Sequence, residues 1–429
     1  MDPARRRRTS SRWLDRPDLS WARRLVVAVT VLGLVAVACS NDNDPDQASS
    51  GTGTSSAATE PPAPTTTARA RIEVIPGMPE VTDPDNLYSD TGVNKFSAAV
   101  ADALPRVYVP NRGANTVSVI DPATMSVVDT FPVGINPQHV APSWDLTTLW
   151  VTDTAEGRTD GSLTPIDPKT GKPGPKVFVD DPYNLYFTPD GKSAVVVAEA
   201  LRRLDFRDPI TMEMQTSISV PNCNGVNHGE FSIDGKFAIF TCEFQGSLVK
   251  IDVLNRTVLG YLDLSGRGMP QDIRSSPDGK VFYIAEMMEG VVYTVDPYAF
   301  TETGKIATGV GAHGLYPSRD ATKLYVANRG HSHVGGNAQD GPGSISVIDF
   351  ATKSVIANWP IPDGGSPDMG NVTADGKTLW LAGRYDNEVY AIDTTTGAVT
   401  KIPVGREPHG LTVWPQPGRY SIGHTGNMR

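Results

Sequence analysis

The chain has 429 residues, and its 38 lysine and arginine side chains against 48 aspartate and glutamate side chains give a formal net charge of −10. Residues 1–38 contain eight arginines and three aspartates, so the rest of the chain carries 30 basic and 45 acidic side chains, a balance of −15. This acidic balance argues against nucleic acid as a partner. No Gly-x-Ser-x-Gly, phosphate-loop or Cys-x-x-Cys-His motif occurs, so the enzyme classes with those signatures have no support.

Residues 1–38 have the pattern of an export signal. A basic segment precedes the apolar run Leu25–Ala38, which is short for a membrane-spanning helix but suits a signal-peptide core. The run ends in small residues directly before Cys39, which resembles the lipobox of bacterial lipoproteins, where the cysteine is diacylated and becomes the new N-terminus. The alternative is an ordinary signal peptide with an incidental cysteine. We predict an extracytoplasmic lipoprotein, attached to the cell membrane through a lipid on Cys39.

Two segments separate this signal from the repeats. Residues 39–67 are rich in Ser, Thr, Ala, Pro and Asp and contain very few apolar side chains, so they predict a disordered tether. Residues 68–104 form an N-terminal extension, with one short helix expected within Phe96–Leu104.

The segment from 105 to 414 repeats itself seven times. An aspartate follows an apolar residue at the same point of every copy, at Asp121, Asp167, Asp205, Asp252, Asp296, Asp349 and Asp393. The gaps are 46, 38, 47, 44, 53 and 44 residues. A period near 45 residues, filled with short alternating strands, predicts an all-β seven-bladed β-propeller.

Turn residues divide each repeat into four strands, called A to D from the channel outward. Asp-Gly pairs such as Asp190-Gly191 and Asp375-Gly376 mark the hairpin between strands A and B. The repeats begin at a strand B, Val107–Asn111, and end at an unpaired strand A, His409–Trp414. We therefore expect the C-terminal strand to complete the first blade, which leaves no open sheet edge. Residues 415–429 form a C-terminal tail outside the repeats.

The repeat "VYVPNRGANTVSVIDPATMSVVDTFPVG" and its copies resemble the YVTN-type β-propeller family over residues 105–414. Members of this family are often seven-bladed and exported or surface-bound. The resemblance implies the fold but not one function, because related propellers include surface-layer proteins, lactonase-like enzymes, streptogramin-lyase-like proteins and the propeller half of nitrous oxide reductase. The clustered cysteines of a two-cysteine copper centre are missing, which argues against a full nitrous oxide reductase.

Polar side chains gather at one end of the predicted channel. The start of strand A carries His139, Asn184, His228, Asp272, His313, Asp368 and His409. The neighbouring end of strand B carries Asn111, Asp153, Glu199, Cys242, Glu286, Asn328 and Gly383. Counted from the next turn, the first four residues of the strand A set sit one position later than the last three. Adjacent strand residues point to opposite faces, so the set need not form one planar ring.

Converging imidazoles and carboxylates are the ligands that a divalent metal such as Zn, Cu, Fe or Mn requires. The candidate ligands are His139, His228, Asp272, His313, Asp368, His409, Asp153, Glu199 and Glu286. The leading hypothesis is a propeller that binds a metal ion or small ligand at this channel mouth. One alternative is a metal-dependent lyase, hydrolase or oxidoreductase that uses the same groups as acids and bases. Another is a structural or protein-binding surface protein, in which the histidines bond backbone groups and cap the channel.

The remaining cysteines and one insertion lie near the same mouth. Cys223 and Cys242 belong to one blade of an exported protein, so a disulfide is expected, with a thiolate–imidazole metal site as the alternative. The sixth copy contains an insertion, Gly330–Gly343, whose His331 and His333 either add metal ligands or lie in a solvated loop.

Overall fold

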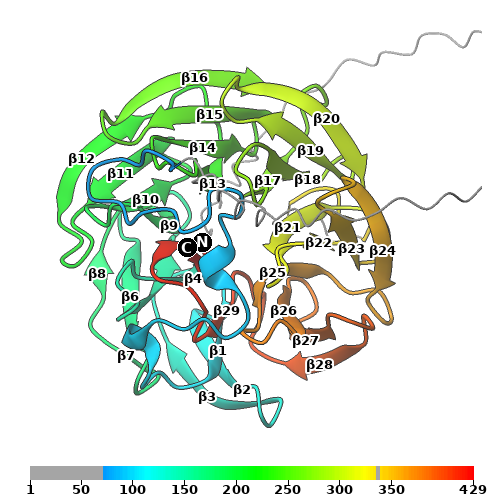
Figure 1. Ribbon diagram of the computed structural model, residues 1–429. Helices are drawn as coiled ribbons and strands as arrows, with labels where there is room; N and C mark the ends of the chain where they lie inside the picture. Colours follow the sequence, from blue (N-terminus) through cyan, green and yellow to red (C-terminus); the bar gives the residue numbers. More distant parts are fainter. Residues whose placement is uncertain (1–70, 335–338) are drawn as a thin grey trace, which may run out of the picture. The chain divides into compact units, whose positions relative to one another are not determined.

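Seven antiparallel sheets form a ring around a central channel in the computed structural model, which describes residues 71–334 and 339–429 (Figure 1). The predicted all-β seven-bladed propeller is confirmed. The predicted signal peptide, the tether and Cys39 lie outside the described residues. Within the described ranges, none of the helices has the length and apolar character needed to cross a membrane.

The strands of each blade follow one another from the channel outward. The first blade consists of β29 (Thr412–Trp414), β1 (Arg106–Asn111), β2 (Thr116–Asp121) and β3 (Ser126–Pro132). The second consists of β4 (Pro137–Pro142), β5 (Leu149–Asp153) and β6 (Ser162–Asp167), followed by the short β7 (Lys172–Pro173) and β8 (Val177–Phe178), which both pair with β6. The third consists of β9 (Pro182–Phe187), β10 (Ala194–Ala198), β11 (Arg203–Arg207) and β12 (Met214–Ser219).

The other four blades have four strands each. The fourth consists of β13 (Val226–Phe231), β14 (Phe237–Cys242), β15 (Ser247–Asp252) and β16 (Thr257–Asp263). The fifth consists of β17 (Pro270–Ser275), β18 (Phe282–Glu286), β19 (Val291–Asp296) and β20 (Thr301–Ala307). The sixth consists of β21 (Ala312–Pro317), β22 (Lys323–Asn328), β23 (Ser344–Asp349) and β24 (Ser354–Pro360). The seventh consists of β25 (Pro367–Val372), β26 (Thr378–Gly383), β27 (Glu388–Asp393) and β28 (Val399–Pro403).

The repeated aspartate at the end of strand C closes the turn to strand D. The carboxylate of Asp121, for example, accepts a hydrogen bond from the backbone N–H of Ala123 at 2.9 Å. In the third blade this role belongs to Asp208, which accepts from the N–H groups of Ile210 and Thr211. Asp205, the residue that the repeat pattern selects, lies inside β11 instead. The repeat pattern therefore selected the wrong aspartate in the third blade, and this accounts for the irregular spacing there.

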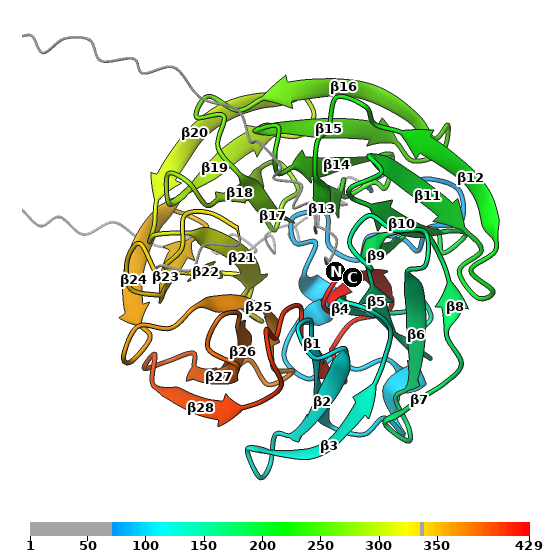
Figure 2. The same cartoon turned by 180° about the vertical axis from the view of Figure 1, so that it is seen from behind.

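The ring closes as expected. β29 pairs with β1, with Arg106 opposite Trp414, so the first blade is built from both ends of the repeat region. The core lies between neighbouring blades, because strands A, B and C are buried almost throughout whereas strand D has alternate residues exposed. Figure 2 shows the same ring from behind.

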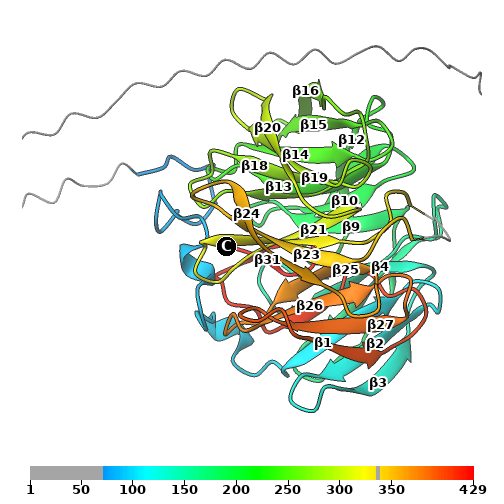
Figure 3. The same ribbon diagram turned by 90° about the vertical axis from the view of Figure 1, so that its right-hand side faces the viewer.

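Residues on both sides of the repeats cover one face of the ring (Figure 3). The N-terminal extension contains two 3₁₀ helices, η1 (Ser89–Thr91) and η2 (Ala98–Val100), the second inside the segment where a helix was expected. Its backbone bonds to A–B turns of several blades, including Ile75 N–H to Asp234 O at 3.1 Å and Asn94 N–H to Ala374 O at 2.9 Å.

The C-terminal tail enters the channel. It forms β30 (Ser421–Gly423) and β31 (Asn427–Met428), and β30 pairs with the channel strand β9 of the third blade. The segment from Tyr420 to Arg429 is buried throughout. The tail therefore belongs to the propeller's interior, although it lies outside the repeats.

Candidate metal centre in the channel

β-bulges at the start of the channel strands direct polar side chains into the channel. In β4 the register shifts between Pro137 and Val140, so Gln138 and His139 together face one residue of β5. The same shift occurs in β13 around His228, in β17 around Asp272 and in β25 around Asp368. A bulge re-aims a side chain and leaves a backbone group unpaired.

Threonines opposite two of these bulges satisfy the unpaired backbone groups. The Oγ1 atom of Thr152 accepts a hydrogen bond from the N–H of His139 at 3.0 Å. Thr241 accepts from the N–H of His228 at the same distance. The two histidines are therefore held by neighbouring strand B, and their rings are free to point into the channel.

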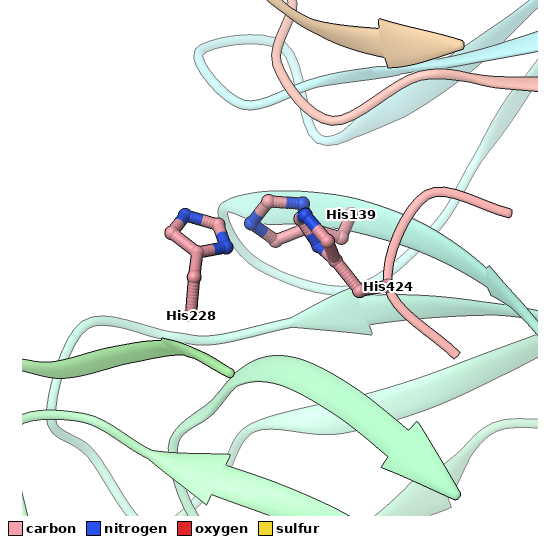
Figure 4. Close-up of side chains that lie close together, drawn as sticks. All are labelled: His139, His228 and His424. Atoms are coloured by element: carbon pink, nitrogen blue, oxygen red, sulfur yellow. The ribbon is translucent and has the colours of Figure 1, made fainter. Parts of the chain in front are cut away.

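Three fully buried histidines meet there: His139, His228 and His424 (Figure 4). One ring nitrogen from each lies within 4.8 Å of the others. His139 and His228 come from the second and fourth blades, whereas His424 comes from the turn between β30 and β31. Neither ring nitrogen of His139 has a hydrogen-bond partner among the described residues, an unusual state for a fully buried imidazole.

Gly410 makes room for this arrangement. A Cβ atom at position 410 would collide with the Nδ1 atom of His139. The backbone at residues 139 and 410 also forms an isolated bridge. Only glycine allows the chain leading into β29 to pass this close to the imidazole.

Asn184 and Asp272 fix the other two rings. The Asn184 side-chain amide donates to Nδ1 of His228 at 3.1 Å and to Nδ1 of His424 at 2.9 Å. On the opposite side of its ring, Nε2 of His424 lies 3.3 Å from Asp272. Asp272 also bonds Arg274 at 2.9 Å. A carboxylate that orients an imidazole from behind is a common second partner of metal-binding histidines.

Burial favours the uncharged form of the clustered histidines. Burial, followed by the charges of His409 and His424, holds the pKa of His139 well below its ordinary value of 6.5. Burial and the neighbouring His424 and His139 have the same effect on the pKa of His228. Neutral imidazole is the form that binds metal ions, so no proton has to be removed first.

Asp368 organises a second group beside the first. Its carboxylate accepts from Nδ1 of His409 at 2.6 Å and from Arg329 at 2.6 Å, and it lies 2.9 Å from Nδ1 of His313. Burial alone would raise the pKa of Asp368, but Arg329 and the two histidines hold it well below its usual range. The ring centres of His139 and His409 are 4.8 Å apart, so the two groups are in contact.

The bulges explain why the two groups separate. In the second, fourth and fifth blades the polar residue is the second member of the bulge, as at His139, whereas in the seventh it is the first, Asp368. This is the one-residue difference in register visible in the sequence. His139, His228 and Asp272 thus surround His424, and His313 and His409 surround Asp368.

Other predicted ligands lie elsewhere. The Oδ2 atom of Asp153 accepts hydrogen bonds from Ser162 at 2.8 Å and Thr164 at 2.6 Å, which ties β5 to β6. Asn111 and Asn328 make equivalent bonds in their own blades. These strand B residues brace the sheet and take no part in the histidine cluster.

The two predicted glutamates have different surroundings. Glu286 accepts hydrogen bonds from the backbone N–H groups of Met269, Met288 and Glu289, so it holds loops together. Glu199 lies at the channel mouth next to Glu243. Burial and the charge of Glu243 raise the pKa of Glu199 well above the ordinary value, so burial and this neighbour both favour its protonated form.

The cysteines and the insertion lie in the fourth and sixth blades. Cys223 and Cys242 form a disulfide in the fourth blade, whose strand β13 carries His228. Val334 of the insertion lines the mouth cavity. His331 is buried, with its ring centre 4.5 Å from that of Tyr385, whereas His333 is exposed.

His424 was missing from the sequence-based set. His424 does not occupy a repeat position, because the C-terminal tail contains no copy of the blade pattern. The only signal was its composition: a histidine between glycines, Gly423 and Gly426, both of which have positive φ angles of 95° and 74°. Such a pattern predicts a tight turn but does not indicate where the turn packs.

Fold and site together define a class: a seven-bladed β-propeller with a buried imidazole cluster in its channel. The chain belongs to the YNCE-like beta-propeller family, whose model matches residues 73–417. No curated protein matches the sequence.

Several solved structures share the fold at low sequence identity. Hydrazine synthase from Kuenenia stuttgartiensis has a TM-score of 0.53 at 20% identity, covering 64% of this chain and 88% of that one. The dihydro-heme d1 dehydrogenase NirN has 0.55 at 15% identity, covering 79% and 82%. A putative 6-phosphogluconolactonase from Bacteroides uniformis has 0.58 at 17% identity, covering 72% and 98%. At these identities the likeness extends to the fold alone.

Proposed function

We propose that this protein is an exported, lipid-anchored propeller that binds a transition-metal ion at His139, His228 and His424. The observation that carries the proposal is the imidazole of His139, which is fully buried with both nitrogens unpartnered among the described residues. A buried polar group without a partner costs roughly 1–3 kcal/mol, and a metal bond would offset that cost.

The donor set fits such an ion. Three neutral imidazoles suit zinc, copper or iron better than the harder manganese, which prefers oxygen ligands. Zinc–nitrogen bonds of about 2.0–2.1 Å in a tetrahedral site need ligand nitrogens about 3.3 Å apart. The ring nitrogens lie within 4.8 Å of one another, so each ring would move inward by about 0.9 Å or less to reach this spacing. When bound, it would supply a Lewis acid.

Elemental analysis tests this proposal. The full chain is purified without chelator, incubated with each of zinc, copper, iron and manganese, and desalted. We expect about one metal ion per chain in the native protein and in His333→Ala, which removes an exposed histidine outside the cluster. His139→Ala should lose the ion and keep its fold by circular dichroism. A native chain that retains none of the four ions would refute the metal site.

The anchor is tested separately. Mass spectrometry of the mature N-terminus should find a diacylated Cys39, and Cys39→Ala should release the protein from the membrane fraction. An unmodified N-terminus after cleavage would leave an ordinary exported protein. A buried disulfide in the propeller is consistent with folding in an oxidising compartment.

A second candidate function is a metal-dependent lyase, hydrolase or oxidoreductase. A chain of polar groups favours it: Asp368 bonds Nδ1 of His409 at 2.6 Å, and Nε2 of His409 lies 3.5 Å from the Tyr183 hydroxyl. A carboxylate behind an imidazole is a typical acid–base arrangement. The lactonase-like resemblance directs a first screen to lactones. Turnover that is lost in Tyr183→Phe while metal is retained would support an enzyme, whereas an inactive metal-bound protein would favour simple binding.

A further inference from the structure

A separate cavity opens at the channel mouth. It has a volume of about 290 Å³ and lies where strands B end and strands A begin, away from the A–B turns that the N-terminal extension contacts. His313 and His409 line it, so it borders the Asp368 group. The three histidines of the candidate metal centre are not among its lining residues. Seven charged residues belong to the lining: Arg112, Glu156, Asp181, Glu199, Glu243, Arg329 and Arg384.

The acidic groups of the cavity are already occupied. Asp181 accepts hydrogen bonds from Thr154 and from three backbone N–H groups, which makes it a loop-bracing residue. Glu243 accepts from Asn227 at 2.6 Å and from Gln271 at 3.0 Å. Burial and the charge of Glu243 raise the pKa of Glu199 well above its ordinary value, which disfavours a negative charge on Glu199.

Two of the three arginines also have partners. Arg112 forms ion pairs with Glu156 and, at 2.7 Å, with Glu407. Arg329 bonds Asp368 at 2.6 Å. In this respect Arg384 differs from both.

Arg384 is 91% buried and forms no ion pair within the described parts of the chain. Its buried Nη1 atom has no hydrogen-bond partner there either. Burial lowers its pKa, the charge of Asp368 opposes this, and the positive charges of Arg329 and Arg112 add to the lowering. A guanidinium nevertheless remains charged at any physiological pH. Asp368 acts on Arg384 only from a distance, because its carboxylate already bonds Arg329 and His409. A guanidinium buried without a bonded counter-ion disfavours the free protein, and a bound anion would offset that cost.

We infer that the mouth cavity is a binding site for a small oxyanion, either a carboxylate or a phosphate, held by Arg384. The planar guanidinium offers paired N–H donors that match two oxygens of such a group. Arg112 and Arg329 line the same cavity, but Glu156, Glu407 and Asp368 already offset their charges, so Arg384 is the arginine left to bind an anion. The overall charge of −10 would not predict an anion site, so this site depends on where the arginines are placed locally. It does not depend on a metal at the histidine cluster.

Calorimetric titration of the full chain tests the inference. The probes are inorganic phosphate and succinate, at constant ionic strength, against native protein, Arg384→Met and a control, Arg267→Met. Arg267 is 72% exposed and lies outside the cavity, so the control removes the same charge from the surface. We expect saturable binding of at least one probe to the native chain and to the control. Binding should be weakened tenfold or more in Arg384→Met.

Stability without ligand provides a second measurement. Because Arg384→Met removes an uncompensated buried charge, its melting temperature without ligand should equal or exceed that of the native chain. Preference for phosphate or for succinate identifies the ligand class. No saturable binding of either probe by the native chain up to about 10 mM would overturn the inference, as would equal affinity in Arg384→Met. Retained metal in Arg384→Met would show that the oxyanion site and the candidate metal centre are independent of each other.

Discussion

The carboxyl of Asp153 allows a quantitative prediction. Burial raises its pKa from 3.8 to about 6, although Ser162, Thr164 and the Gly134 backbone donate hydrogen bonds to it. The folded chain therefore holds this proton more tightly than the unfolded chain does. Asp153 therefore makes the folded state less stable as the pH rises from about 3.8 to about 6. Above that range its stabilising contribution is completely lost.

The size of the effect comes from the same two values. At about 1.4 kcal/mol for each pKa unit, the step from 3.8 to about 6 corresponds to about 3 kcal/mol over the whole titration. Of this loss in unfolding free energy, about 2 kcal/mol is expected between about pH 4.5 and pH 8. Asp153→Asn removes the titrating group, so the difference in unfolding free energy between these two pH values should change by that amount.

Urea unfolding at the two pH values measures this change. Each protein is compared with itself, so any constant cost of the asparagine cancels. Asp160→Asn serves as the control, because Asp160 is an exposed aspartate in the loop that follows β5. If Asp153→Asn shows the pH dependence of the native chain to within about 0.5 kcal/mol, the buried-carboxyl reasoning is wrong.

Three further predictions concern the channel. Asp368→Asn leaves the Arg329 guanidinium buried without its counter-charge, so urea unfolding should show a loss of about 3–5 kcal/mol; a loss below about 1 kcal/mol would contradict the ion pair. Replacing both cysteines of the Cys223–Cys242 disulfide, which are 19 residues apart, with alanine should cost about 3 kcal/mol in the same assay. Gly410→Ala should displace the His139 ring and reduce metal retention by elemental analysis, although it removes no ligand; unchanged retention would exclude this geometry.

The seven-bladed ring could be predicted from the sequence because every blade is built from the same local structures. Every blade needs the same hairpin turns and the same alternation, so Asp-Gly pairs and the strand C aspartates recur at a readable period. The strand A histidines were predictable for the same reason. Their grouping was not, because it depends on bulges: one inserted residue decides whether His139 or its neighbour faces the channel.

Residues with similar chemistry proved to have different surroundings. Asp153 and Glu286 carry the carboxylates that a metal site needs, yet two hydroxyls bond Oδ2 of Asp153 and backbone N–H groups bond Glu286. Such partners lie on other strands and loops, and no sequence spacing specifies them. His424 depends on the packing of a segment outside the repeats, which only tertiary structure reveals.

Closure of the first blade has a consequence for how the chain reaches its native state. β1 is made early in synthesis, but its channel-side partner β29 lies about 300 residues later. Until that strand arrives, β1 presents an unpaired edge that other chains could extend. Such long-range pairing is slow because of the chain entropy that it costs. The nascent propeller should therefore depend on chaperones, and the channel should acquire its final form only in the last step of folding.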